Sequence, residues 1–215
     1  VYNLHWKLTG VINGTYSKKI LDTYSLERKA IVKSVTETAI KQGNIVGTQN
    51  KYVALVRDFI LNCARQFPAL LNFFQFYHPW PIKEGLIDKT LFKNKANGIV
   101  IPQPDTNITI EDKAFDQYIG YKFALLVFDQ DQEVFDKIKS LDSVKIFDGN
   151  IHLLNPTHPF NADKSFVEWQ KKHNISAVII RPDRHVYGCC DHHSIIQKID
   201  KLSNKLHNSI NGTIS

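Results

Sequence analysis

The strongest constraint on the fold is the alternation of strand and helix patterns between residues 107 and 206. Short β-branched or apolar runs, which predict strands, occupy residues 107–110, 123–128, 144–147, 177–180 and 185–190. Apolar residues at helical spacing occupy residues 131–140, 162–173 and 194–206. The last two strands flank Arg-Pro-Asp-Arg at 181–184, a turn that makes them an antiparallel hairpin. This order predicts an α/β layer sandwich.

Strand, helix, strand, helix, hairpin, helix is the order of the thioredoxin fold, whose redox motif is Cys-x-x-Cys. No Cys-x-x-Cys occurs in the chain, and the loop after the strand at 123–128 holds Asp129, Gln130, Asp131 and Gln132. The sequence therefore predicts a thioredoxin-like domain without thiol chemistry at the usual place.

The first half of the chain has helical patterns instead, at residues 4–11, 22–45 and 52–77, the last with Pro68 inside it. The pattern at 52–77 is apolar around much of its circumference and indicates a partner surface. Residues 79–98 are rich in proline and polar turn residues. We therefore expect a helical segment at 1–78, a connector at 79–98 and the α/β domain at 99–215.

Composition excludes some classes of protein. With 43% hydrophobic and 22% charged residues, the 215-residue chain is globular rather than disordered. It has no apolar run long enough to span a membrane, and its first residues lack the apolar core that is typical of a signal peptide. Lysines are spread evenly despite a net charge of +6, and the three cysteines form no disulfide framework. These features favour a cytoplasmic protein that binds neither nucleic acid nor membrane. Since Val1 stands where Met would start translation, we expect a longer functional unit.

Short stretches along the whole chain resemble one known family. They are 2–8 (Tyr-Asn-Leu-His-Trp-Lys-Leu), 21–28, 98–104, 119–126, 169–174 and 178–184. The first two resemble the segment that follows the second flavin-contacting motif of FAD-dependent aromatic monooxygenases of the phenol hydroxylase type. The others resemble the family's thioredoxin-like C-terminal domain. Within the family, the likeness is strongest to the enzymes that hydroxylate 3-(3-hydroxyphenyl)propionate.

The resemblance implies that the chain is the C-terminal portion of such an enzyme. The parent would reduce FAD with NADH or NADPH and hydroxylate a phenol with O2. The family's Gly-x-Gly-x-x-Gly would lie before Val1, and Gly10, Gly14, Gly43 and Gly47 do not replace it. We therefore expect no catalytic, cofactor-binding or metal residues in this portion, and neither FAD nor NAD(P)H bound to it. Its expected partners are the rest of the parent chain and, through oligomerisation, a second copy.

Two clusters carry alternative interpretations. Cys189-Cys190-Asp191-His192-His193 could hold a metal, but adjacent strand residues point to opposite faces, which favours a strand end followed by a loop. Arg181, Asp183 and Arg184 could bind an anion, although a solvated hairpin tip with a local ion pair is favoured.

Two residues of the first predicted helix are further candidates for a functional role. His5 is expected to be a packing residue, and Asn3, the nearest candidate to the flavin, is expected to cap or pack the helix. Two functional alternatives remain beside the hydroxylase fragment. One is a redox-inactive binding module that docks a protein partner, and the other is a metal or thiol protein that uses Cys189 and Cys190.

Overall fold

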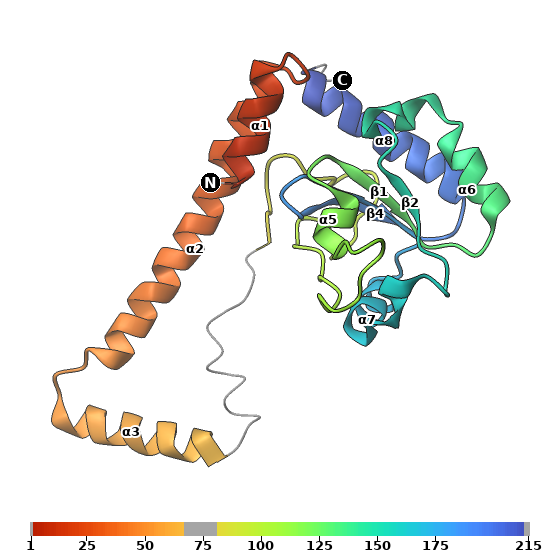
Figure 1. The fold of residues 1–215 in the computed structure, drawn as a ribbon. Coiled ribbons are helices and arrows are strands. Elements are labelled where there is room, and N and C mark those ends of the chain that lie inside the picture. The colour runs from red at the N-terminus through yellow and green to blue at the C-terminus, as the bar shows by residue number, and fades with distance from the viewer. Residues whose placement is uncertain (1, 67–80, 213–215) are drawn as a thin grey trace. The chain divides into compact units, whose positions relative to one another are not determined.

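The computed structural model describes residues 2–66 and 81–212 (Figure 1). Among these, residues 2–27 and 81–212 form one compact unit, and residues 28–66 belong to another. The first unit therefore combines the first helix of the chain with the α/β domain. The sequence-based division at residues 78 and 98 stays a prediction.

The core of the first unit is a four-stranded mixed sheet with the order β2-β1-β3-β4. Its strands are β1 (Ala124–Val127), β2 (Ile151–Leu153), β3 (Ala177–Ile180) and β4 (Val186–Cys190). β1 runs parallel to β2 and antiparallel to β3, and β3 pairs antiparallel with β4. Every residue of β1, β3 and β4 is buried, which explains why these strands are continuous apolar runs rather than alternating ones.

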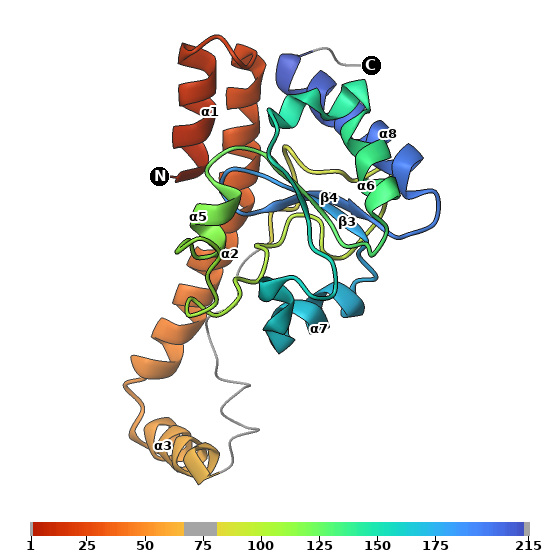
Figure 2. The ribbon, with the colours of Figure 1, turned by 45° about the vertical axis from the view of Figure 1, so that its right-hand side comes forward.

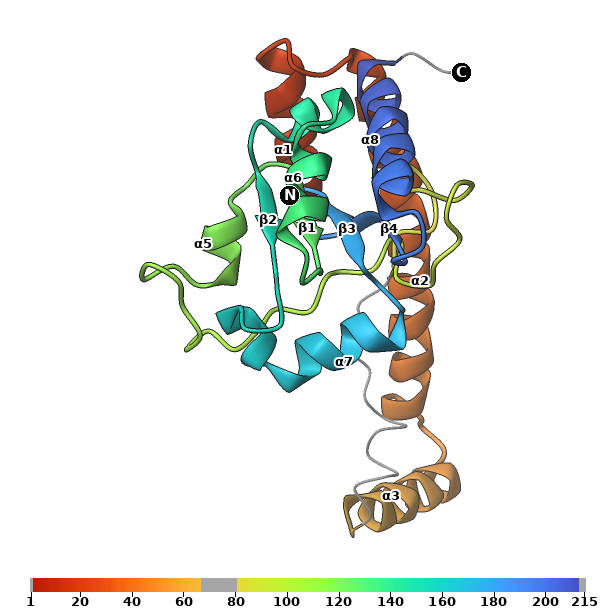
Figure 3. The same ribbon diagram turned by 90° about the vertical axis from the view of Figure 1, so that its right-hand side faces the viewer.

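Helices cover both faces of this sheet. On one face, α6 (Gln132–Lys139) and α8 (Ile195–Asn211) bury apolar side chains together with α1 (Tyr2–Ile12) and η1 (Lys18–Leu21). On the other face, α5 (Phe115–Ile119) and α7 (Lys164–Lys172) pack with η3 (Pro159–Ala162). Figure 3 shows α6 and α8 on one side of the sheet and α7 on the other. The predicted thioredoxin-like layer order is confirmed.

Two predicted strands are wrong. Residues 142–147 form the 3-10 helix η2 (Asp142–Phe147), because Val144 and Phe147, three residues apart, are both buried on one side of it. The second strand of the sheet begins later, at Ile151. Residues 107–110 form no strand, since a tight turn with left-handed Glu111 and Asp112 leaves only a single bridge between Ile110 and Lys113.

The connector between the two halves lies along β4, the outer strand of the sheet. Two backbone hydrogen bonds join them, from Asp88 N to Tyr187 O (2.7 Å) and from Gly98 N to Val186 O (2.8 Å). The residues after the connector continue this pairing, from Val186 N to Ile99 O (2.8 Å) and from Ile101 N to Arg184 O (3.0 Å). Gly98 has a φ of +84°, and a Cβ there would lie 2.0 Å from the Ile82 carbonyl oxygen. Only glycine permits this close approach of two backbone segments.

The second unit contains most of α2 (Asp22–Val46) and α3 (Lys51–Gln66). Both helices were predicted; the part of the predicted helix beyond residue 66 lies outside the described residues. Arg57 of α3 donates to the carbonyls of Ile45 (3.3 Å) and Val46 (3.0 Å) at the end of α2. No side chain of residues 28–63 is buried. Neither α2, α3 nor any other helix within the described residues is long and apolar enough to cross a bilayer.

Candidate functional site

A buried guanidinium is the centre of the most unusual polar arrangement in the first unit. Arg181, at the end of β3, is fully buried. Its Nη1 and Nη2 donate to the two carboxylate oxygens of Glu27 (2.9 and 2.8 Å), and its Nε and Nη2 donate to those of Asp183 (3.0 and 2.7 Å). Nη1 also donates to the Leu86 carbonyl (2.9 Å). All five N–H groups of the guanidinium are therefore satisfied.

Glu27 connects this guanidinium to the N-terminal helix. Its Oε2 accepts from Lys7 Nζ (2.8 Å) and Asn3 Nδ2 (2.7 Å), and its Oε1 accepts from the Leu86 N–H (2.9 Å). Lys7 Nζ donates in addition to Thr23 Oγ1 (2.7 Å). Asn3 and Lys7, and likewise Thr23 and Glu27, are four residues apart in sequence, so each pair shares one helix face.

We call the set of Asn3, Lys7, Thr23, Glu27, Arg181 and Asp183 the ionic junction. It contains two cations and two carboxylates, so its formal charge is zero. Trp6 supports it, because the Arg181 Cζ and Lys7 Nζ lie 5.4 and 5.5 Å from the centre of the indole ring. A buried set of paired charges fixes the geometry of its elements, since removing one member leaves its partner buried and unpaired.

The junction also sets the protonation of its members. Burial lowers the pKa of Lys7 to about 8, and the attraction of Glu27 only partly opposes this. Burial alone would raise the pKa of Glu27 and of Asp183, but Arg181 holds both below their ordinary values, with help from Lys7 at Glu27 and from His185 at Asp183. Both carboxylates are therefore ionised at neutral pH.

The predicted hairpin tip is partly right. The local ion pair between Arg181 and Asp183 is confirmed, with 2.7 Å between Nη2 and Oδ2. The prediction that the tip is solvated is wrong, because Arg181 and Asp183 are buried beneath Glu27, which comes from a distant part of the chain. Arg184 is half-buried and binds Asp116 Oδ1 (2.7 Å). The donors of Arg181 are all taken, which leaves it unavailable for an anion.

The structure agrees with the prediction for Asn3 of α1 but not with the prediction for His5. Asn3 packs as expected, with its Nδ2 2.7 Å from both Glu27 Oε2 and Asp183 Oδ2. The prediction that His5 is a packing residue is wrong. The buried face of α1 carries Trp6, Lys7 and Gly10, whereas His5 is exposed and lines an open groove of about 900 Å³.

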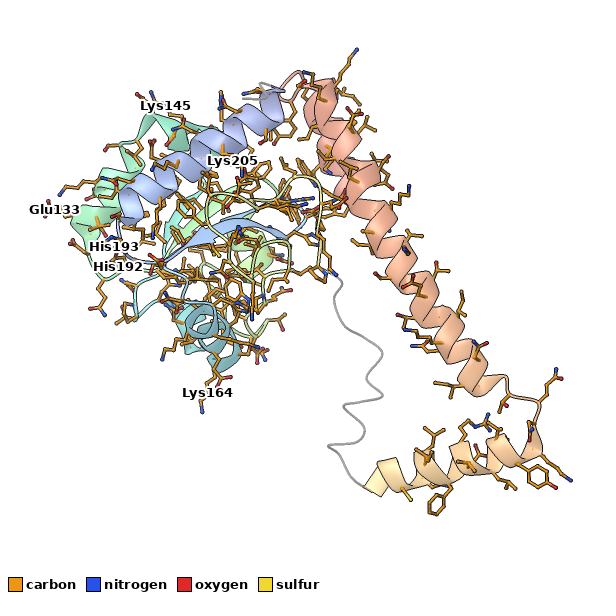
Figure 4. All side chains as sticks on the ribbon, turned by 180° about the vertical axis from the view of Figure 1, so that it is seen from behind. Glu133, Lys145, Lys164, His192, His193 and Lys205 are labelled. Atoms are coloured by element: carbon orange, nitrogen blue, oxygen red, sulfur yellow. The ribbon has the colours of Figure 1, made fainter. Side chains whose placement is uncertain are left out.

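The cysteine-histidine cluster separates as the strand argument predicts. Cys189 belongs to the core on one face of the sheet and Cys190 to the core on the other. Burial raises the pKa of Cys189 and raises that of Cys190 to about 12, so both thiols are poor nucleophiles. His192 and His193 are exposed before α8 (Figure 4). Within residues 2–66 and 81–212, no three His, Cys, Asp or Glu residues are arranged to hold a metal ion.

The four glycines of α1, α2 and the turns after them, Gly10, Gly14, Gly43 and Gly47, do not form the glycine turn at a helix start that binds a flavin pyrophosphate. Gly10 lies inside α1, where a Cβ would lie 1.9 Å from the Tyr16 ring, so it serves packing. Gly43 lies within α2. Gly14 and Gly47 each come just after a helix and four residues before the next one, which begins at Lys18 and Lys51 respectively, so neither opens a helix.

Sequence reasoning missed Lys7, Glu27 and Trp6 as members of a site. The signal was the helical spacing between each charge and apolar residues: Lys7 lies three residues after Leu4 and four before Val11, and Glu27 lies three residues after Tyr24 and four before Ile31. Such a charge is buried only with a partner, and the sequence does not show that the partner is Arg181, 154 residues further along the chain.

Two family models match the chain. The model of the FAD binding domain matches residues 1–39, and that of the HcaD C-terminal domain matches residues 98–205. The ionic junction therefore joins residues of both matches, Lys7 and Glu27 from the first and Arg181 and Asp183 from the second.

Curated relatives are hydroxylases of phenylpropanoid acids. A 3-(3-hydroxy-phenyl)propionate/3-hydroxycinnamic acid hydroxylase of Burkholderia cenocepacia is 26% identical over 225 residues, which cover 89% of this chain and 39% of that protein. An enzyme of the same name from Escherichia coli O157:H7 is 25% identical, covering 95% and 40%. The chain thus spans about two-fifths of the length of these relatives.

Solved structures share the fold. RebC with reduced flavin, a rebeccamycin biosynthetic enzyme, superposes with a TM-score of 0.60 at 16% identity, covering 97% of this chain and 40% of that one. The flavin-dependent monooxygenase PieE, in complex with FAD and substrate, gives 0.58 at 15% identity, covering 97% and 43%. OxyS anhydrotetracycline hydroxylase from Streptomyces rimosus gives 0.56 at 20% identity, covering 89% and 36%.

Proposed function

The chain belongs to the family of the HcaD C-terminal domain, and from this membership we propose that it is the C-terminal part of a flavin-dependent aromatic hydroxylase. The parent would use FAD, NAD(P)H and O2 to hydroxylate a phenolic acid similar to 3-(3-hydroxyphenyl)propionate. The names of the curated relatives support this substrate class.

The observation that carries the structural part of the proposal, the role of this chain within the enzyme, is the ionic junction. It attaches the two N-terminal helices, which match an FAD binding domain, to the hairpin of the C-terminal domain. Because its charges are buried and paired, the junction resists small changes of geometry. The role of this chain is to hold α1 and the start of α2 in one fixed position, and the chemistry belongs to the flavin bound elsewhere in the enzyme.

A chimera tests this role. The segment of the Burkholderia relative that aligns with this chain is replaced by this chain, and the product is compared with the 215-residue chain alone. We expect the chimera to be yellow with flavin and to oxidise NADH or NADPH faster when the phenolic acid is added. We expect the chain alone to be colourless and inactive.

The junction itself is tested in the same chimera with Glu27→Gln. Loss of one carboxylate charge leaves two buried cations short of a partner, so flavin retention and coupled hydroxylation should both fall. Glu37→Gln, on an exposed part of α2, is the matched control and should change neither. A folded chimera without flavin, or an isolated chain that binds FAD and hydroxylates a phenol, would refute the proposal.

A second candidate function is that of a redox-inactive module that docks a protein partner. The observation favouring it is the apolar surface of residues 28–63, where Tyr52, Leu55 and Phe59 are each 66–70% exposed. Light scattering over a concentration series tests it on the intact chain. A monomer at high concentration that binds no apolar dye would count against this candidate.

A further inference from the structure

A cavity of about 320 Å³ lies beyond the carboxyl ends of β1 and β2 in the first unit. It is lined by Phe128, Asp129, Gln130, Leu154, Pro156, Asn161, Val167, Gln170 and Lys171. These residues follow β1, follow β2, or belong to η3 and α7. Since β1 and β2 are parallel neighbours, their carboxyl ends meet, and crevices at that edge of an open α/β sheet are where ligands bind.

Asp129 places a buried carboxylate in the cavity wall. Its side chain is only 8% exposed. Its Oδ1 accepts from the N–H groups of Gln130 (2.7 Å) and Asp131 (3.1 Å), which fixes the orientation of the carboxylate. Its Oδ2 is buried and has no hydrogen-bond partner among the described residues. The Nδ1 of His192 lies 3.5 Å away, on a ring that is 72% exposed and can move aside without loss of packing (Figure 4).

Asn161 contributes a second acceptor to the same wall. Its Nδ2 donates to the carbonyls of Asn155 (2.7 Å) and Leu154 (3.4 Å), so the amide orientation is set by these bonds. Its Oδ1 is buried, and within residues 2–66 and 81–212 nothing donates to it. Buried acceptors without donors are rare and indicate a missing group with N–H or O–H bonds to offer.

The other residues of the cavity wall indicate which kind of donor group would bind to Asp129 and Asn161. Phe128, Leu154, Pro156 and Val167 are apolar, which suits an alkyl chain. A hard metal ion needs six or more oxygen ligands, whereas this wall offers, among the described residues, two unpartnered side-chain acceptors, Asp129 Oδ2 and Asn161 Oδ1. We propose that this cavity binds a small primary alkylammonium ion, whose N–H groups donate to Asp129 and Asn161. The proposal does not depend on the hydroxylase assignment.

Titration of the ¹⁵N-labelled 215-residue chain with n-butylammonium chloride tests the proposal. We expect saturable chemical-shift changes confined to residues that line the cavity. Butan-1-ol has the same alkyl chain without the charge, and tetramethylammonium has the charge without N–H donors, so both should bind far more weakly. Equal binding by either compound, or shifts without saturation, would overturn the proposal.

Two variants distinguish binding to the Asp129 carboxylate from general attraction of the ammonium ion to negative charge on the surface. Asp129→Asn should weaken butylammonium binding roughly tenfold or more, because a charged hydrogen bond is lost. The matched control is Asp131→Asn, which removes the same charge two residues away, where Asp131 Oδ1 caps α6 by accepting from Glu133 N (2.8 Å). It should leave the affinity within about twofold, since an exposed charge outside the site is screened. Equal weakening by both variants would refute a specific site.

A third variant keeps every charge but fills the cavity. Val167→Trp fills the cavity from α7 and should abolish binding, while α7 stays folded because Val167 is only half-buried. Retained binding in this variant would place the ammonium elsewhere and overturn the proposal, even if Asp129→Asn failed to fold.

Discussion

The two compact units differ in what they bury. In the unit formed by residues 2–27 and 81–212, even charged side chains are buried, and those of the ionic junction are all paired. In residues 28–63 no side chain is buried, and many large apolar ones are exposed. The exposed set is Val32, Val35, Ile40, Ile45, Val46, Tyr52, Val53, Leu55, Val56, Phe59, Ile60 and Leu61.

This difference indicates that the first unit is stable by itself, whereas the helices of the second unit depend on a partner surface for their stability. The first unit has both a two-sided apolar core and internal partners for its buried charges. In the second unit, no side chain of the described residues 28–63 is buried, and Arg57 links α3 to the end of α2 by exposed hydrogen bonds. Helices without a packed face are marginal in water, so α3 should open far more readily than α8.

Cysteine reactivity should give the largest difference. Cys63 lies half-buried on α3, whereas Cys189 and Cys190 are buried on β4. Buried thiols react only when the structure opens, so we expect Cys63 to be alkylated about a thousandfold faster or more. Iodoacetamide labelling followed by peptide mass spectrometry measures the three rates. Similar rates at all three positions would mean that the first unit is not stably folded.

Loss of the junction carboxylate should have the next largest effect. Glu27→Gln leaves Arg181 and Lys7 buried with insufficient negative charge, and we expect it to lower the free energy of unfolding by about 3–5 kcal/mol. Glu37→Gln breaks only an exposed ion pair with Lys33, 4.0 Å long, and should cost about 0.5 kcal/mol or less. Urea unfolding followed by circular dichroism compares them, and equal losses would contradict the role of the junction.

Truncation of one leucine in each unit tests how much buried apolar side chains contribute to the stability of that unit. Leu126→Ala removes a fully buried side chain of β1 and should cost about 2–5 kcal/mol. Leu55→Ala removes a side chain that is 66% exposed on α3 and should change stability by about 0.5 kcal/mol or less. A large loss for Leu55→Ala in the isolated chain would show that α3 is already covered, for example by a second copy.

The pH dependence should give the smallest effect. Because the pKa of Lys7 is about 8 in the folded chain and 10.5 ordinarily, the unfolded chain binds more protons between these values. Lys7 therefore makes stability rise with pH from about 8 to about 10, by an amount on the order of 1–3 kcal/mol.

Buried Tyr187, Cys189 and Cys190 act in the opposite direction at alkaline pH, since burial raises the pKa of each. The Lys7 contribution is therefore measured as the difference between the wild-type chain and Lys7→Met in urea unfolding at pH 7, 8, 9 and 10. A difference that stays constant across this range would show that Lys7 keeps its ordinary pKa.

Strands and helices that follow from a local pattern of apolar residues could be predicted well from the sequence. β1, β3 and β4 were found because strands buried on both faces are continuous apolar runs. β2 was misplaced because its three half-buried residues, Ile151 to Leu153, carry less signal than the apolar run of η2 just before it.

The site was much harder to predict than the fold. The Arg181–Asp183 pair is local and was found, but its burial depends on Glu27, and that contact exists only after the chain has folded. The acceptors of the small cavity were not predicted either, since Asn161 and Asp129 are ordinary loop residues in the sequence. Burial and missing donors, which single them out, are properties of the tertiary structure.

The connector along β4 has a consequence for how copies of the chain meet one another. An open sheet has two edges, and unpaired backbone groups on an edge can recruit strands from other molecules. Here residues 88–101 occupy hydrogen-bonding positions beside β4, and the opposite edge is β2, with only three residues. In the folded chain the continuous apolar strands of this sheet are thereby kept from intermolecular β-pairing, which opposes the growth of fibrous aggregates from the native state.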